Sequence, residues 1–428
     1  MKIGIFVMIL FFLSGCFEEK TQATQQKNAS SIYKIPKSSV AMLGVLVSYK
    51  DKKIVYSDEV WSKKLFGFEE GDLNSYYMQA SAGKFAFKEV SEQSNRENDG
   101  IISVVLDQNH PNLDIDSASY EDIVYPSLQD ALQKIDKYID FSNYDFDANG
   151  YISANELIIV FIIAGYEDAY EGYHINYGTW AHQNCIDNSS HLITLDGVTL
   201  MGCQNNGNFA LFGELHNQNN PHMATIGIIA HELGHATFNL PDLYNTTNPN
   251  EGGIGYFGLM GSGIWARKNA SEYAGQTPTH FCAWSKMYNG WITPVTEKDT
   301  QTSLYETASD EYNIIKIPIS QTSYYLLENR NDSGYDSGLH ALEGNFQGGM
   351  ALWKIDETKL TAGHILQNDV NSNTQAQGVT LIEAVKGDID QGGGGNANAL
   401  FYEGNKNYFQ TLITDISKPN RIMSLNVH

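Results

Sequence analysis

The chain has 428 residues, which is long for one domain and sufficient for two. Acidic residues outnumber basic residues by 50 to 27, and the formal net charge is -23. This charge repels polyanions, so the composition argues against a protein that binds nucleic acid or an anionic membrane surface. Hydrophobic residues make up 42% of the chain, which excludes a disordered protein and allows a sizeable core.

The N-terminus predicts export from the cytoplasm. Lys2 precedes an apolar run over 3–13 (IGIFVMILFFL), and small residues follow before Cys16. This pattern is typical of a secretory signal peptide over 1–15 and is too short for a permanent membrane span. The segment 13–16 (LSGC) resembles the bacterial lipobox, which implies that Cys16 is lipidated and becomes the mature N-terminus. The alternative is an ordinary signal peptide with an incidental cysteine.

A lipidated Cys16 predicts an extracytoplasmic protein, anchored to a bacterial outer membrane or cell surface. The lipid would be its only contact with the membrane. The residues 16–36 are polar and rich in Gln, Ser and Asn, so we expect a flexible tether.

Strands and one helix are expected in the region that follows the tether. Strand-like runs lie at 41–49, 85–90 and 101–106. A helix is expected to begin at Pro126, because proline is tolerated in a first turn and the apolar residues after it keep helical spacing. The apolar, β-branched run 157–164 (LIIVFIIA) predicts a central buried strand.

The segment 145–156 (DFDANGYISANE) matches a twelve-residue calcium loop. The loop type takes ligands from alternating positions, needs glycine at its sixth position for a sharp turn, and closes with a two-oxygen glutamate. The alternative is an Asx-rich turn without metal. Because a strand is expected next, the loop predicts a stabilising site and not a sensor. The predicted calcium ligands are Asp145, Asp147, Asn149, Tyr151 through its carbonyl, and Glu156.

Three cysteines remain after Cys16. In an oxidising compartment, Cys185 and Cys203 can close a short loop as a disulfide, which leaves Cys282 as a buried free thiol.

The segment 231–235 (HELGH) carries the most specific signal for chemistry. A helix expected over 223–238 places His231 and His235 one turn apart on the same face, so both imidazoles can bind one Zn²⁺. Glu232 can then take a proton from the attacking water as a general base. Taken singly, a buried histidine is usually a core residue and a helical glutamate is usually solvated.

The residues after this helix predict a third ligand. Asn239 tolerates the left-handed conformation that ends a helix, and Pro241 prevents its continuation. A chain reversal at Asn239 would bring Asp242 back toward the two histidines, leaving a fourth position open, as catalytic zinc sites do. Alternatively, Asp242 caps the next turn. Further on, Met260 lies in a glycine-rich segment and looks like the Met-turn that forms a hydrophobic floor beneath the metal of metzincins.

The sequence pattern changes after Pro294, where strand-like runs predominate. Strand-like runs follow at 313–319, 324–328, 349–355, 379–385 and 422–427. We therefore expect a catalytic domain over 37–294 and a β-rich domain over 295–428.

Several segments together resemble the M6 family of secreted metallopeptidases, the immune-inhibitor-A-like proteins. They are 231–244 (HELGHATFNLPDLY), 256–265 (YFGLMGSGIW) and 278–294 (PTHFCAWSKMYNGWITP). The family usually has one glycine where this chain has Phe238 and Asn239, so its interval from histidine to aspartate is one residue longer. The resemblance implies an α+β fold: a metzincin-like zinc peptidase domain, with a mixed sheet and an active-site helix, followed by a β-rich C-terminal domain.

The sequence thus predicts a monomeric zinc endopeptidase that hydrolyses extracellular proteins or peptides, with Zn²⁺ and Ca²⁺ as cofactors. Tyr244 and Tyr273 are the tyrosines nearest in sequence to the segment 231–235, and either could stabilise the oxyanion. A rival hypothesis is a non-catalytic, calcium-dependent surface lipoprotein on a peptidase scaffold. A third keeps zinc hydrolysis but directs it at a glycan or a mucin-like glycoprotein.

Overall fold

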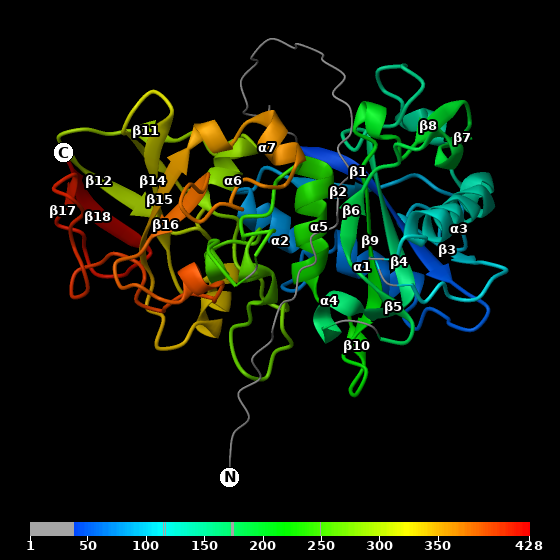
Figure 1. The fold of residues 1–428 in the computed structure, drawn as a ribbon, viewed down its shortest axis with the longest axis horizontal. Helices are drawn as coiled ribbons and strands as arrows, with labels where there is room; N and C mark the ends of the chain where they lie inside the picture. Colours follow the sequence, from blue (N-terminus) through cyan, green and yellow to red (C-terminus); the bar gives the residue numbers. More distant parts are fainter. Residues whose placement is uncertain (1–37, 114, 116, 173–174, 249) are drawn as a thin grey trace. The chain divides into compact units, whose positions relative to one another are not determined.

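The computed structural model describes residues 38–428 except 114, 116, 173–174 and 249 (Figure 1). The predicted signal peptide, Cys16 and the tether lie outside the described residues. The described chain divides into two compact units. One unit comprises residues 40–64 and 87–224, and the other comprises residues 65–86 and 225–428.

The first unit is built on an eight-stranded mixed sheet. Its main strand order is β10-β9-β4-β1-β2, while β3 pairs with β1, β5 with β4, and β6 with β9. The strands are β1 (Ser39–Ser48), β2 (Ala86–Glu89), β3 (Ile101–Val105), β4 (Leu157–Glu167), β5 (Gly178–Thr179), β6 (His182–Asn184), β9 (Phe209–His216) and β10 (His222–Met223). The strand β4 runs parallel to both β1 and β9, whereas β6 and β10 pair antiparallel with β9. The predicted mixed sheet is therefore confirmed.

The centre of this sheet follows from its sequence. Ten of the eleven residues of β4 are buried, as the continuous apolar run predicted for a strand with neighbours on both sides (Figure 1). The neighbouring β9 (FALFGELH) is also buried throughout, but it was not expected. Its Gly213, Glu214 and His216 interrupt the apolar run, and such residues ordinarily indicate a loop.

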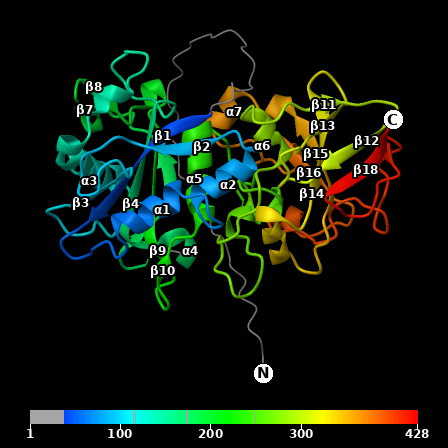
Figure 2. The same ribbon diagram turned by 180° about the vertical axis from the view of Figure 1, so that it is seen from behind.

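The helix expected to begin at Pro126 begins earlier. Helix α3 covers Tyr120–Ile135, so Pro126 lies inside it, and the prediction of a first-turn proline was wrong. The buried face of α3 includes Leu128, Leu132 and Ile135, which pack into the same apolar core as the sheet residues. Figure 2 shows α3 beside β3. This packing extends the helix past a proline, which by itself removes one backbone donor.

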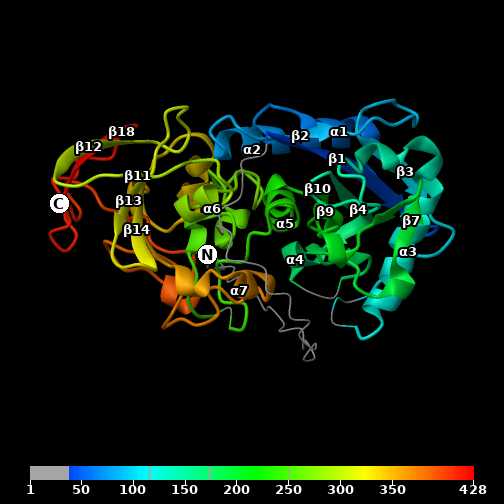
Figure 3. The same ribbon diagram turned by 90° about the horizontal axis from the view of Figure 1, so that it is seen from above.

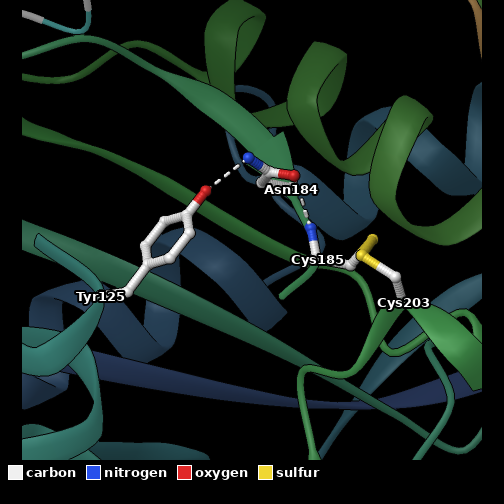
Figure 4. Close-up of a disulfide and its surroundings, with 4 residues drawn as sticks. All are labelled: Tyr125, Asn184, Cys185 and Cys203. Atoms are coloured by element: carbon white, nitrogen blue, oxygen red, sulfur yellow. Dashed lines mark hydrogen bonds between the residues drawn. A yellow bond between two sulfur atoms is a disulfide. The ribbon is translucent and has the colours of Figure 1, made fainter. Parts of the chain in front are cut away.

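Short elements complete the first unit. They are α1 (Asp58–Phe66), whose last two residues belong to the second unit, α4 (Asp168–Glu171), the hairpin β7 (Ile193–Leu195) and β8 (Val198–Leu200), and the 3-10 turns η1 (Asp136–Tyr138), η2 (Phe141–Tyr144), η3 (Ser189–His191) and η4 (Cys203–Asn205). Cys185 and Cys203, the predicted pair, are joined by a disulfide across this hairpin segment (Figure 4). Next to it, the Asn184 amide donates to the Tyr125 hydroxyl and accepts from the Cys185 N–H.

The second unit contains the predicted ligand helix and the β-rich region. Its helices are α2 (Leu73–Ala80), α5 (Ile226–Phe238), α6 (Ala283–Tyr288) and α7 (Ala362–Leu366). Its 3-10 turns are η5 (Gly255–Phe257), η6 (Ser262–Trp265), η7 (Gly334–Ala341), η8 (Glu357–Lys359) and η9 (Ile389–Gln391). The helix predicted over 223–238 thus begins three residues later, because Met223 belongs to β10.

Two sheets follow Pro294 in this unit. The larger has the order β11-β13-β14-β15-β16, and β11, β13 and β14 are seen side by side in Figure 3. Its strands are β11 (Val295–Thr296), β13 (Ile315–Pro318), β14 (Ser323–Arg330), β15 (Gly349–Asp356) and β16 (Val379–Ile382). The smaller sheet has the order β12-β18-β17, with β12 (Thr300–Tyr305), β17 (Ile413–Thr414) and β18 (Ile422–Val427). The β-rich C-terminal region is confirmed.

The predicted boundary near Pro294 stays a prediction. The second unit contains α5 together with both C-terminal sheets, so its compactness does not follow that boundary. A compact unit can still contain more than one folding domain, so the two units neither confirm nor exclude a domain boundary near Pro294. Within the described residues, the helices lack the combination of length and apolarity that crossing a membrane requires.

Candidate metal centre

Helix α5 is buried along its whole length and ends where the sequence indicated. All thirteen residues of Ile226–Phe238 are buried, and Asn239 adopts a left-handed conformation with φ 49° and ψ 40°. The Asn239 N–H bonds the His235 carbonyl at 2.8 Å, and the Leu240 N–H bonds the Gly234 carbonyl at 3.2 Å. These two bonds form a closing turn of the kind that glycine usually permits, so Asn239 takes the place of glycine here.

This turn brings Asp242 back to the two histidines. The Nε2 atoms of His231 and His235 are 3.1 Å apart, and Asp242 Oδ1 lies 3.2 Å from each of them. Tetrahedral zinc with ligand bonds of about 2.0–2.1 Å places its ligand atoms about 3.3 Å apart. The three atoms therefore have the spacing of a zinc site with three protein ligands.

Backbone carbonyls orient both imidazoles. The His231 Nδ1–H donates to the Leu259 carbonyl at 3.0 Å, and the His235 Nδ1–H donates to the Leu240 carbonyl at 2.5 Å. When the two rings are neutral, these bonds place the proton on Nδ1, so both Nε2 atoms present lone pairs on the side of Asp242 Oδ1. Three acceptor atoms thus converge on one point, an arrangement that a cation satisfies.

The electrostatics of this cluster also favour positive charge. Burial lowers the pKa of His235, but the Asp242 carboxylate outweighs burial and raises that pKa to about 9. Burial would raise the pKa of Asp242, yet His235 and His231 hold it well below its usual range. The carboxylate therefore stays ionised at neutral pH, as a metal ligand must.

Glu232 and Tyr244 lie beside the cluster. Glu232 is buried on α5, and its charge acts on both His235 and Tyr244. The Tyr244 hydroxyl bonds Asp242, and burial, followed by the Asp242 charge, raises the Tyr244 pKa well above its usual value. Tyr244 thus stays protonated at neutral pH and remains a hydrogen-bond donor.

Met260 packs against α5. A Cβ atom placed on Gly234 would lie 3.0 Å from the Met260 sulfur, so the thioether fills the space that this glycine leaves. The Met260 carbonyl also accepts from the Leu243 N–H at 2.7 Å, which ties the methionine turn to the Asp242 turn. Because Leu259 of the same turn accepts the His231 Nδ1–H, the methionine turn orients a predicted ligand and packs below its helix.

A contact that sequence reasoning missed holds Asp242 from the C-terminal region. The Asn368 amide donates to Asp242 Oδ2 at 2.6 Å, and its oxygen accepts the Asp242 N–H at 2.7 Å. The two residues are 126 positions apart. No local pattern signals such a contact, since Asn368 lies in a polar loop after α7.

A buried ion network, also missed, supports the methionine turn. Arg330 is fully buried, and its guanidinium pairs with Asp336 through Nε at 2.6 Å and Nη2 at 2.5 Å. Its Nη1 donates to the Phe257 carbonyl at 2.5 Å and lies 3.4 Å from Glu328. Phe257 precedes Leu259 by two residues, so the network from β14 and η7 reaches the turn that orients His231.

The calcium-type loop lies in the first unit, between η2 and β4, and is followed by a strand as predicted. Asp145, Asp147 and Glu156 bring carboxylate oxygens within 4.8 Å of one another. The Glu156 carboxylate accepts from the Phe146 N–H at 3.0 Å and from the Ser153 N–H at 2.9 Å, which fixes it facing the loop. These contacts hold the three acidic side chains of the loop close together.

The remaining predicted ligands of the loop also take positions within it. Gly150 has φ 80°, as the sharp turn needs. The Asn149 side-chain oxygen accepts the Tyr151 N–H at 2.8 Å.

Two further predicted residues lie outside the loop. Cys282 is a buried free cysteine, as predicted. Tyr273, the other tyrosine considered for the oxyanion, is 39% exposed.

The chain is similar to known peptidases. The catalytic-domain model of the immune inhibitor A peptidase family M6 matches residues 48–292, more than half of the chain. The pre-pro-metalloprotease PrtV of Vibrio cholerae, in two strains, is 38% identical over 84 residues, which are 19% of this chain and 8% of PrtV. The chain thus matches a small part of that relative.

Solved structures of wild-type OgpA from Akkermansia muciniphila in two crystal forms align weakly. One is 12% identical, with coverage of 77% of this chain and 88% of that chain and a TM-score of 0.25. The other is 11% identical, with coverage of 78% and 94% and a TM-score of 0.25. A likeness this weak supports no conclusion about fold or function.

Proposed function

The chain belongs to the immune inhibitor A peptidase family M6, and from this premise we propose that it is a zinc endopeptidase acting on proteins outside the cytoplasm. Membership of the family and the likeness to a metalloprotease support metallopeptidase activity. We propose in addition which metal is bound, which residue is the general base and which substrates are cleaved.

One observation carries the proposal. Asp242 Oδ1 lies 3.2 Å from both histidine Nε2 atoms, and both histidines donate their other ring N–H to backbone carbonyls. Three soft or anionic acceptors at tetrahedral spacing suit Zn²⁺, and three protein ligands leave one position for water or substrate, as in catalytic sites. We assign the zinc to His231, His235 and Asp242, in a metzincin-like domain with Met260 beneath the ligand helix.

Bound zinc would polarise the scissile carbonyl and make water acidic enough to attack near neutral pH. Glu232 accepts the proton of that water and delivers it to the leaving amine. Tyr244 is placed to donate to the developing oxyanion, since its hydroxyl already bonds a predicted ligand and stays protonated. We prefer it to the partly exposed Tyr273 for this role.

We also propose that the loop 145–156 binds Ca²⁺ as a stabilising site. Its acidic side chains converge and Glu156 is held by local N–H groups, which matches the geometry of loops that bind calcium through oxygen ligands. The predicted ligands are unchanged: Asp145, Asp147, Asn149, Tyr151 and Glu156.

The proposed setting is the outer membrane or cell surface of a bacterium. The signal peptide over 1–15 and the lipobox-like residues ending at Cys16 support export and lipid anchoring. A disulfide between Cys185 and Cys203 is compatible with an oxidising compartment. We expect a monomer tethered through residues 16–36.

The test is Glu232→Gln in the protein without its signal peptide. Removing the general base should lower casein cleavage by about 10²–10⁴-fold, while zinc content stays at one per chain. Glu311→Gln, a matched change of an exposed glutamate, should cleave as the unmodified protein does. Full casein cleavage by Glu232→Gln would contradict the mechanism.

The same preparation separates the rival functions. Calcium without stoichiometric zinc, and no cleavage of any substrate, would replace the peptidase by a calcium-dependent surface binder. Cleavage of mucin with no cleavage of casein would direct the activity to glycoproteins.

A further inference from the structure

We propose that Asn368 is a positioning residue that makes Asp242 a one-oxygen metal ligand. The inference rests on the proposed role of Asp242 in holding zinc. Asn368 occupies Oδ2 of this carboxylate at 2.6 Å, while Oδ1 faces the two histidines at 3.2 Å. The Asn368 amide thus holds Oδ2, the Tyr244 hydroxyl also bonds this carboxylate, and Oδ1 is the oxygen that faces the metal position.

The orientation of the Asn368 amide is fixed by its partners. The Asp242 N–H can only donate, so it must face the amide oxygen, which lies 2.7 Å away. The Asp242 carboxylate can only accept, so it must face the amide NH₂. Both bonds go to one residue, which fixes the rotation of the carboxylate as well as its place.

The backbone of Asn368 is itself held. Its carbonyl accepts from the Thr246 hydroxyl at 3.0 Å, and its N–H bonds the Ile365 carbonyl at 3.2 Å. Its φ of 52° is left-handed, a conformation that asparagine tolerates better than most residues. The amide is thus presented to Asp242 in a preset position, which lowers the entropy lost in holding the ligand.

Asn371 docks the same loop in a different way. Its amide donates to the carbonyls of Leu243 and Val379 at 3.0 and 2.9 Å, and its oxygen accepts the Val379 N–H at 3.1 Å. Asn371 therefore fastens the loop to backbone, whereas Asn368 reaches a carboxylate. Loop docking and ligand positioning are separable, and substitutions can test them apart.

Partners of this kind tune metal sites. A hydrogen bond to a ligating carboxylate orients it, and loss of such a bond costs about 10–100-fold in metal affinity. Since Asn368 is neutral, it orients Asp242 without removing the negative charge that the metal needs. Asn368 acts through Asp242 and has no direct part in the reaction.

The experiment compares Asn368→Ala and Asn368→Asp in the full mature chain, with Asn373→Ala as the matched control. Asn373 is exposed in the same loop. Its side-chain oxygen accepts the N–H of Gln375, two residues away. Zinc affinity is measured by competition with a chromogenic chelator. The absorption of the Co²⁺-substituted protein reports ligand geometry, and thermal unfolding of the metal-free protein reports loop docking.

We expect both Asn368 variants to bind zinc about 10–100-fold more weakly, with a shifted Co²⁺ spectrum. Asp is isosteric and keeps the acceptor for the Asp242 N–H, but it places a second carboxylate against Oδ2. It should therefore weaken zinc binding at least as much as alanine does. Asn373→Ala should match the unmodified protein in affinity and spectrum.

Two results would overturn the inference. Zinc affinity and Co²⁺ spectrum unchanged in both variants would remove any positioning role. Unchanged affinity in Asn368→Asp alone would assign the effect of alanine to the backbone contact and not to the donor. A failure of the proposed function looks different: the unmodified protein would then bind no stoichiometric zinc, and His235→Ala would change nothing.

Discussion

The cluster of His231, His235 and Asp242 and the calcium-type loop 145–156 differ in how far along the chain their hydrogen-bond partners lie. In the loop, the side-chain hydrogen bonds of Asp145 and Glu156 join residues no more than ten positions apart. In the cluster, His231 is oriented by a carbonyl 28 positions away and Asp242 by an amide 126 positions away. The cluster is buried, whereas Asp147 of the loop is exposed.

This difference shows what each site depends on. The predicted ligands of the loop all lie within twelve residues, although its backbone also bonds Thr199 and Asn206. The cluster takes its two histidines from one helix, but their orientation depends on segments that reach the end of the chain. Damage far from α5 should therefore affect the cluster, whereas the loop should respond mainly to changes within it, to its backbone partners Thr199 and Asn206, and to calcium.

The largest effect is expected from His235→Ala. Loss of one nitrogen ligand should remove zinc and reduce peptidase activity to the background of the assay, because two protein ligands do not hold catalytic zinc. Zinc content by mass spectrometry of the metals and cleavage of casein check this result. The loop should still bind calcium in this variant. Active, zinc-loaded His235→Ala protein would show that the cluster is not the catalytic site.

Arg330→Met should lower the free energy of unfolding by about 3–5 kcal/mol, because it leaves Asp336 buried without its cation, whereas Glu328 keeps Lys286 at 3.9 Å. It should also weaken zinc binding, since the Phe257 carbonyl loses its donor. Urea denaturation followed by tryptophan fluorescence measures the change. Arg421→Met is the control, because that arginine is 76% exposed in its ion pair with Glu306 and should contribute at most about 1 kcal/mol. Equal losses in the two variants would contradict a supporting role for the network.

Glu156→Gln should remove the calcium-dependent part of the stability. Calcium at about 100 times its dissociation constant stabilises a folded site by about 2.7 kcal/mol. The melting temperature of the unmodified protein should therefore rise by several degrees on adding calcium, while that of the variant stays constant. Without calcium the variant should melt slightly lower, because the amide NH₂ replaces one of two oxygens that accept backbone N–H groups. If calcium stabilises the variant equally, the loop is not the site.

Gly234→Ala should cost about 1 kcal/mol and reduce zinc affinity. The new Cβ would lie 3.0 Å from the Met260 sulfur, and the strain outweighs the better helix propensity of alanine. The double variant with Met260→Ala should regain part of this loss, because the space then opens. Denaturant unfolding of the two single variants and the double variant gives the coupling energy. If the changes in the free energy of unfolding simply add in the double variant, the side chain at position 234 and Met260 do not interact.

Much of the candidate site was predictable because its rules are local. The spacing of His231 and His235 follows from 3.6 residues per helical turn, and the turn at Asn239 from the few residues that adopt a left-handed conformation. The calcium-type loop and the buried β4 were readable for the same reason. Their signals lie within a dozen residues.

Errors arose where packing outweighed local preference. Helix α3 runs through Pro126 because its apolar face is buried against the sheet. Strand β9 includes Glu214, whose buried carboxylate accepts the Val55 and Tyr56 N–H groups. Burial raises the pKa of Glu214 to about 7, which a sequence pattern cannot show.

By itself, the sequence predicted which residues carry the proposed chemistry: two histidines on one helix face, a glutamate between them, and an aspartate after a left-handed asparagine. Only the tertiary structure decided how they are held. The Leu259 carbonyl, the Asn368 amide and the Arg330 guanidinium come from segments separated by scores of residues. Helical period and turn chemistry act over a few residues, whereas hydrogen-bond partners at such separations are selected by the packing of the whole unit.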